Sequence, residues 1–188
     1  MEKVRKVVKK YYLRQIMTYW LACWMFFGLP AQVATAAVSG GAFQLGGTGT
    51  IVNDPTGTVE VAQLESVIHW DSLDTVLGES LTFTQGGLSN SAVLNRVVGN
   101  GASSATSFGG LLEATDMRIF IVNPAGIIFT DDAAINVSQL VASSLKISDG
   151  DFTNGIYNFT DGLTAGDVTN ESTNPRVNMS PFRKMGRS

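Results

Sequence analysis

After the first 37 residues, apolar positions come in short runs separated by turn-forming residues. Residues 58–61 alternate between polar and apolar side chains, as a half-buried strand does. Further on, apolar runs at 118–122, 126–129, 134–137 and 140–145 recur about every eight residues, with turns of about two to four residues between them. No segment from residue 37 onward carries an apolar stripe at helical spacing over three turns. The pattern predicts an all-β fold.

The same rhythm fits a parallel β-helix, a solenoid whose coils hold roughly 20 residues or a little more. In such a fold, inward positions form apolar ladders, while hydroxyl, Asn and Asp side chains occupy the corners and the outer face. Sandwiches and barrels use similar short strands, and the internal repetition of this sequence is weak. Periodicity alone therefore leaves the three architectures open.

One turn has a clear local signature. Asn123-Pro124-Ala125-Gly126 places Asn first, Pro second and Gly fourth, as a type I turn favours. Proline presets φ, and the Asn side chain can accept a hydrogen bond from the backbone two residues on. Turns of this kind occur in any all-β protein, so the plain interpretation is a tight corner.

The first 36 residues follow a different pattern. A basic stretch leads into the uncharged run Ile16–Leu29, which is shorter than the roughly 20 residues of a membrane span but suits a signal peptide. Ala34 and Ala36 are small residues of the kind that signal peptidase accepts. We expect a signal peptide over 1–36, cleaved after Ala36 or, alternatively, after Ala37. An uncleaved membrane anchor is the competing interpretation.

Charge and cysteine content narrow the possible partners and cofactors. The first 14 residues hold six of the 13 basic and one of the 16 acidic residues, which leaves seven against fifteen, a net charge of -8, for the rest. Such an acidic body repels phosphate backbones, so we expect no nucleic acid partner. The single cysteine, Cys23, lies in the hydrophobic run. The exported part therefore has neither a disulfide framework nor a thiolate metal site.

The candidates for catalysis are few. His69 is the single histidine, and adjacency in sequence to Asp71 establishes no Ser-His-Asp arrangement, so we expect a strand-end surface residue. Asp131 and Asp132 form the best local carboxylate pair, but they fall in a turn and suit a solvated corner. Asp149-Gly150-Asp151 lacks the ligand spacing of a calcium loop. We expect no catalytic residues, no metal and no cofactor. An extracellular β-helix polysaccharide lyase or hydrolase is the alternative.

Taken together, several ordered segments resemble the two-partner secretion domain, also called the filamentous haemagglutinin N-terminal or haemagglutination activity domain. Asn123-Pro124-Ala125-Gly126-Ile127 is similar to the family motif Asn-Pro-Asn-Gly-Ile, with Ala125 in place of the usual Asn. Leu94-Asn95-Arg96-Val97 resembles a segment of the adhesin-type branch. A second Asn-Pro motif, known in the filamentous haemagglutinin branch, is not visible, which also points to the adhesin-type branch.

Segments before and after the motif extend this resemblance. Val67–Ser72 followed by Leu81–Phe83 is similar to the early strands of the family, and Val141–Leu145 with Asp151-Phe152 is similar to the segment after the motif. The resemblance implies a right-handed single-stranded parallel β-helix with an N-terminal cap, which we expect over 37–171. Residues 172–188 lose the alternation, so we expect an irregular tail produced by truncation or a frameshift.

The resemblance also implies a function. The Sec machinery and signal peptidase deliver such a domain to the periplasm, where the POTRA domains of a cognate outer-membrane β-barrel transporter bind it. The chain then folds outside a Gram-negative-type cell, as the start of a secreted adhesin or haemagglutinin with its own host-cell or surface ligand. The expected site for transporter recognition or for starting the fold comprises Asn123, Pro124, Ala125, Gly126 and Ile127, together with Leu94, Asn95, Arg96 and Val97.

Overall fold

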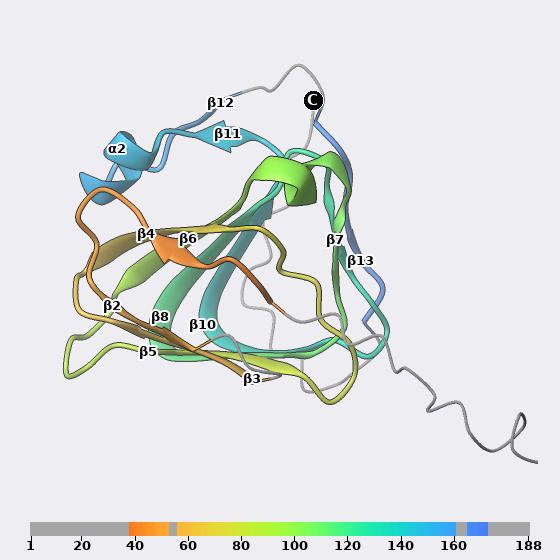
Figure 1. Ribbon diagram of the computed structural model, residues 1–188, viewed down its shortest axis with the longest axis horizontal. Helices are drawn as coiled ribbons and strands as arrows, with labels where there is room; N and C mark the ends of the chain where they lie inside the picture. Colours follow the sequence, from red (N-terminus) through yellow and green to blue (C-terminus); the bar gives the residue numbers. More distant parts are fainter. Residues whose placement is uncertain (1–37, 53–55, 161–164, 173–188) are drawn as a thin grey trace, which may run out of the picture. The chain divides into compact units, whose positions relative to one another are not determined.

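The structure is a computed structural model that describes residues 38–52, 56–160 and 165–172 (Figure 1). These residues belong to one compact unit, Thr35–Ser188. The expected signal peptide, with Ala34 and Ala36, and residues 173–188 of the expected tail lie outside the described residues. No helix in the described ranges is long and apolar enough to cross a bilayer.

Strands account for nearly all of the regular structure. In chain order they are β1 (Ala42–Phe43), β2 (Gly49–Val52), β3 (Thr56–Val61), β4 (Glu65–Trp70), β5 (Ser80–Thr84), β6 (Ala92–Val97), β7 (Thr106–Phe108), β8 (Leu111–Val122), β9 (Ile127–Phe129), β10 (Ala134–Ser143), β11 (Lys146–Ile147), β12 (Phe159–Thr160) and β13 (Val168–Asn170). Two five-residue helices complete the described elements, the 3-10 helix η1 (Gly99–Ser103) and α2 (Asp149–Thr153).

Parallel strands stack into three walls around a shared core (Figure 1). The first wall stacks β3, β5 and the N-terminal parts of β8 and β10. The second stacks β4, β6 and the C-terminal parts of β8 and β10, and the third stacks β7, β9 and β13. The chain visits the walls in turn, so each circuit is one coil of a parallel β-helix. The prediction of an all-β solenoid is confirmed, and connections between parallel strands of one sheet are right-handed as a rule.

The N-terminal end of the stack has a different pairing. β1 runs antiparallel to β4, and β2 runs antiparallel to β3. Phe43 of β1 and Ile51 of β2 are half-buried and pack against the core. These two strands form the predicted cap, because they close the first coil with strands of opposite direction instead of another parallel coil.

Inward side chains form ladders along the stack. In the first wall, Leu81, Leu112 and Ile135 occupy register positions on three successive coils, and all are almost fully buried. In the third wall, the rings of the register partners Phe108 and Phe129 lie tilted to each other, with centroids 6.0 Å apart. Each apolar side chain is covered by its equivalent in the next coil, so the core is built from contacts between neighbouring coils.

At the corner between the first and second walls, the observed strand boundaries differ from the predicted ones. The runs predicted at 134–137 and 140–145 belong largely to one strand, β10, and β8 starts at Leu111, well before the predicted 118. Asp116 bends β8 with a φ of 56°, and the β10 register shifts beside Ser138. The Asp116 N–H donates to Ser138 Oγ at 2.9 Å. With this polar contact, both strands bend at the corner while β8 and β10 stay paired on either side of it.

The chain leaves the coil between β10 and β13. There β11, α2 and β12 lie against the outer face of the second wall, over a second buried cluster that includes Leu94, Phe120 and Phe152. Ser148 caps α2 by accepting a hydrogen bond from the Asp151 N–H at 3.2 Å. This helix is a single turn, too short for the pattern of apolar positions to predict.

Replacing Leu112 with Ala tests the inward ladder. The cavity between Leu81 and Ile135 should lower the free energy of unfolding by about 3 kcal/mol, measured by urea denaturation followed by circular dichroism. The matched control is Glu113→Ala, at the next position of β8, which is only half-buried; we expect less than about 1 kcal/mol. Equal losses for the two variants would contradict the inward assignment of Leu112.

Candidate functional site

The Asn-Pro turn joins the second wall to the third. Asn123 follows β8 directly, and Ile127 begins β9. The Gly126 N–H donates to the Asn123 carbonyl at 3.0 Å, which closes a four-residue turn. The Ala125 N–H donates to Asn123 Oδ1 at 3.0 Å. The tight corner and the side-chain bond to the backbone two residues on are therefore both present as predicted.

The side chain of Asn123 is fully buried and also reaches the previous coil. Its Nδ2 donates to the Ser104 carbonyl at 2.9 Å and to Thr106 Oγ1 at 3.0 Å, where the chain enters β7. The Asn123 amide thus shapes its own turn and ties that turn to the corresponding corner of the previous coil. Because a buried amide without partners is costly, this network favours a single corner geometry.

At Gly126 the neighbouring coil leaves no room for a side chain. Its φ is 114°, and an added Cβ would lie 2.5 Å from the Asp167 carbonyl oxygen of the next coil. That same carbonyl accepts the N–H of Ile127 at 3.0 Å. On the other side, the Gly126 carbonyl accepts the Thr106 N–H at 3.0 Å. The turn is therefore held by backbone hydrogen bonds to the coils on both sides.

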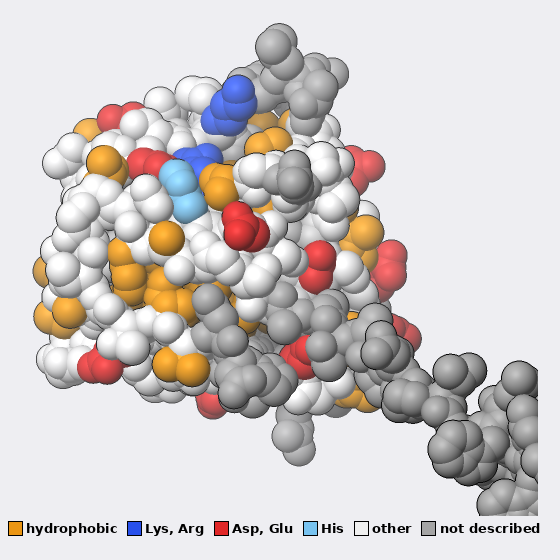
Figure 2. Space-filling view, in the orientation of Figure 1, with side chains coloured by type: hydrophobic (Ala, Val, Ile, Leu, Met, Phe, Trp, Pro, Cys, Tyr) orange, Lys and Arg blue, Asp and Glu red, His pale blue; other side chains and the backbone are white. Residues whose placement is uncertain are grey.

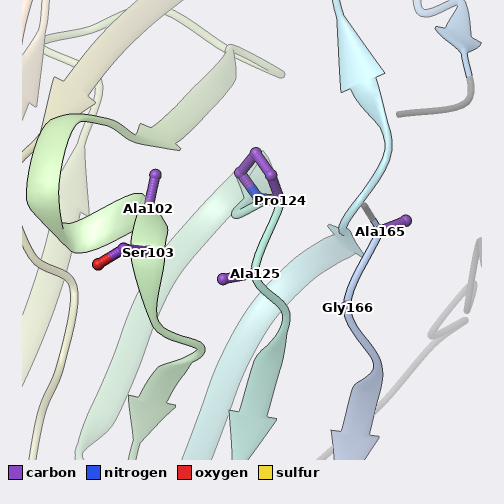
Figure 3. A pocket seen from close by; sticks show the side chains of 6 residues that line it. All are labelled: Ala102, Ser103, Pro124, Ala125, Ala165 and Gly166. Atoms are coloured by element: carbon purple, nitrogen blue, oxygen red, sulfur yellow. The ribbon is translucent and has the colours of Figure 1, made fainter. Parts of the chain in front are cut away.

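A hollow lies over this corner. Figure 3 shows its lining on three segments side by side: Ala102 and Ser103 from η1, Pro124 and Ala125 from the turn, and Ala165 and Gly166 before β13. Pro124 and Ala125 are partly exposed here, whereas Asn123, Gly126 and Ile127 are buried. Within the motif, only Pro124 and Ala125 present surface that a partner protein can contact.

The second predicted segment, Leu94–Val97, is most of β6 and alternates across the wall. Asn95 and Val97 point into the core, and Leu94 belongs to the outer cluster. Asn95 Oδ1 accepts the indole N–H of Trp70 at 3.0 Å, while its Nδ2 donates to the Phe120 carbonyl at 3.2 Å. This buried amide therefore ties the second coil to the first and to the third.

Arg96 points outward and pairs with a residue that the sequence analysis did not connect to it. Its Nε and Nη2 donate to Asp149 Oδ1 at 2.9 and 2.7 Å, and Nη2 also donates to the Ile147 carbonyl. His69 Nε2 lies 2.7 Å from Asp149 Oδ2. His69 is thus a partly exposed residue near a strand end, as expected, but it has an acidic partner 80 residues along the chain. No local pattern signals that pairing.

The two predicted segments lie on neighbouring strands. Arg96 of β6 is the register partner of Val122, which directly precedes Asn123. Sequence reasoning therefore selected residues around one corner region, and most of their side chains are buried. Of the nine residues, Pro124, Ala125 and Arg96 are the ones that are partly exposed.

The other candidates occupy ordinary positions. Asp131 and Asp132 are exposed in the turn between β9 and β10, a solvated corner as expected. Asp149 is bound to His69 and Arg96. Within the described ranges, no three His, Cys, Asp or Glu side chains are grouped so that they could hold a metal ion.

Replacing Asn123 with Ala tests the corner network. The change removes three hydrogen bonds and takes one partner away from the buried Thr106 hydroxyl, so the free energy of unfolding should fall by about 2–4 kcal/mol in urea denaturation. The control is Asn158→Ala, at an exposed position, where we expect a change within about 0.5 kcal/mol. A loss for Asn123→Ala as small as the control's would contradict a structural role for the amide.

Comparisons with known proteins agree with this geometry. A crystal structure of the HMW1 secretion domain from Haemophilus influenzae matches with a TM-score of 0.62 and 26% identity over 72% of this chain. The match covers 35% of that chain, so the present sequence spans about a third of it. No curated protein sequence gives a significant match. The family model for the TPS secretion domain matches residues 33–180, and the chain therefore belongs to the TPS secretion domain family.

Proposed function

We propose that this chain is the N-terminal secretion domain of a larger secreted adhesin or haemagglutinin. In this proposal, the POTRA domains of a cognate outer-membrane transporter bind the domain, and its coils start the folding of a longer β-helix outside the cell. Membership of the TPS secretion domain family supports the secretion role, and the match to only 35% of the HMW1 secretion domain chain is compatible with a larger protein.

The difference between the two ends of the stack carries the proposal. Antiparallel strands β1 and β2 close the N-terminal end. At the other end, the ten-residue strand β10 pairs with β8 along one edge, and no other described strand pairs with it. An unpaired edge is a template for a further strand, and a solenoid unit contacts mainly its neighbours. The fold thus favours growth in one direction, beyond β10.

The candidate site contributes two separable properties. The buried amides of Asn95 and Asn123 set the geometry of the coils, and their burial keeps them from direct contact with a transporter. The exposed corner at Pro124 and Ala125, beside the hollow, supplies the surface for contact (Figure 3). Folding and recognition would then depend on different residues of the same motif.

The remaining parts of the proposal concern export and chemistry. The Sec machinery would export the chain, and signal peptidase would remove residues 1–36. The exported protein would act at the cell surface of a Gram-negative-type bacterium. The full-length adhesin would bind a host-cell or surface ligand. In this proposal the domain itself is a recognition and folding module without catalysis, cofactor or nucleic acid partner.

Secretion of Asn123→Ala, co-expressed with the cognate transporter, tests the function. The altered corner should stop release into the medium while the processed protein still accumulates in the periplasm, measured by immunoblotting of the two fractions. The exposed-site variant Asn158→Ala should be secreted normally. Wild-type release of Asn123→Ala would argue against the turn as part of the secretion signal.

A second variant separates recognition from folding. Ala125→Arg places a long charged side chain at the partly exposed corner without touching the buried amides. We expect an unchanged urea midpoint and at least about a tenfold weaker binding to the purified periplasmic domains of the transporter, measured by calorimetry. Unchanged binding would show that the hollow is not the contact surface.

A further inference from the structure

The outer face of the second wall carries an unusual apolar stripe. Val67, Leu94, Phe120 and Val141 are register partners on four successive coils, and they are 0%, 0%, 4% and 8% exposed. Outward positions of a solenoid ordinarily meet water. Here they are buried beneath residues 146–160, which comprise β11, α2 and β12 and which we call the strap (Figure 1).

Aromatic contacts dock the strap on this stripe. The ring of Phe120 meets Phe152 edge-on at 5.0 Å and lies 5.0 Å from Tyr157 and 6.5 Å from Phe159 between centroids. The strap has little regular structure of its own, because β11 and β12 pair through two residues each and α2 has five residues. Elements this short are marginal in isolation. The order of the strap therefore depends on its contact with the coils.

Asp149 is the polar anchor of the strap. His69 and Arg96 are register partners on the first and second coils, and both bind this one carboxylate, with closest distances of 2.7 Å each. The three side chains are only 28%, 15% and 23% exposed, for His69, Arg96 and Asp149 respectively, so their hydrogen bonds are partly shielded from water. Figure 2 shows the histidine at the surface beside basic and acidic side chains.

A weaker anchor lies near the other end of the strap. The guanidinium of Arg118 sits 5.4 Å from the centre of the Tyr157 ring, and its Nη2 lies 3.8 Å from Glu65 Oε1. Burial raises the pKa of Tyr157, which is consistent with a ring pressed against the coils. The remaining charged strap residues, Lys146 and Asp151, form no ion pair within the described part of the chain. Asp149 is therefore the strap's main electrostatic link to the stack.

We propose that the strap is a latch that opens as a unit while the coils stay folded, and that Asp149 sets the balance between its closed and open states. Closing it clamps four coils together. Because it joins the first coil to a segment 80 residues later, the latch can close only after the intervening coils have formed. Under the proposed function, on which this role rests, the latch closes last, once the coils have wound outside the cell, and its closure completes folding.

Limited trypsin digestion of the purified full chain tests the latch. Lys146 is the only basic residue in the strap and lies in β11, paired with Thr160. In Asp149→Ala, cleavage after Lys146 should be at least about tenfold faster, since protease reaches a segment through its local opening. Mass spectrometry of the fragment that begins at Ile147 reports this cut separately from cuts elsewhere. Circular dichroism of the intact variant should show the coils retained.

Three further variants sharpen the result. Asp151→Ala removes a carboxylate from the same helix that has no ion pair in the described residues, so cleavage should keep the wild-type rate. Asp149→Asn keeps the size of the side chain but loses its charge. Its rate of cleavage after Lys146 should lie between those of wild type and Asp149→Ala. His69→Ala added to Asp149→Ala should cause no further acceleration, because both residues act through one contact.

Two outcomes would overturn the latch. One is a wild-type cleavage rate in Asp149→Ala; the other is acceleration that occurs only where circular dichroism shows the coils unfolding as well. The assay needs no transporter, so its failure leaves the secretion proposal standing. Conversely, normal secretion of Asn123→Ala would count against the proposed function and leave the cleavage result intact.

Discussion

The register between successive coils is the constraint on which the rest of the structure depends. Each coil passes through the three walls in turn, and inward side chains are covered by the same position of the neighbouring coils, as with Leu81, Leu112 and Ile135. A slip of one residue would turn these side chains towards water and bring polar ones inside. Backbone pairing alone does not select the native register, so side-chain interactions must favour it over registers shifted by a residue.

Two buried amides supply that distinction. Asn95 and Asn123 each use their oxygen and their nitrogen in hydrogen bonds to groups at fixed positions on other coils or in their own turn. In a slipped register these polar groups would be buried without partners, which costs more than the net gain of the bonds themselves. The burial of Asn123, the first residue of its turn, is thus compatible with a folding role, while Pro124 and Ala125 are the partly exposed residues of that turn.

The second wall is buried on both faces, and this explains features that otherwise look unrelated. The end of β8 is a continuous apolar run, and every residue of β6 except Arg96 is buried, as in strands covered on both sides. The inner face packs in the main core, while the outer face supports the strap. Arg96 within β6 is the outward polar exception, and it meets Asp149. Because the apolar stripe crosses four coils, one short segment can hold all of them together.

The sequence by itself determined the local features: short strands, the Asn123 turn with its side-chain bond, and enough ordered segments to indicate the family. These signals reside in residues close together along the chain. The tertiary structure decided the rest. Register partners Val59, Phe83, Ala114 and Val137 are separated by 24, 31 and 23 residues, so unequal coils hide which residues stack. The burial of the second wall's outer face and the meeting of His69, Arg96 and Asp149 depend on that stacking, because contacts between distant residues exist only once the coils are wound.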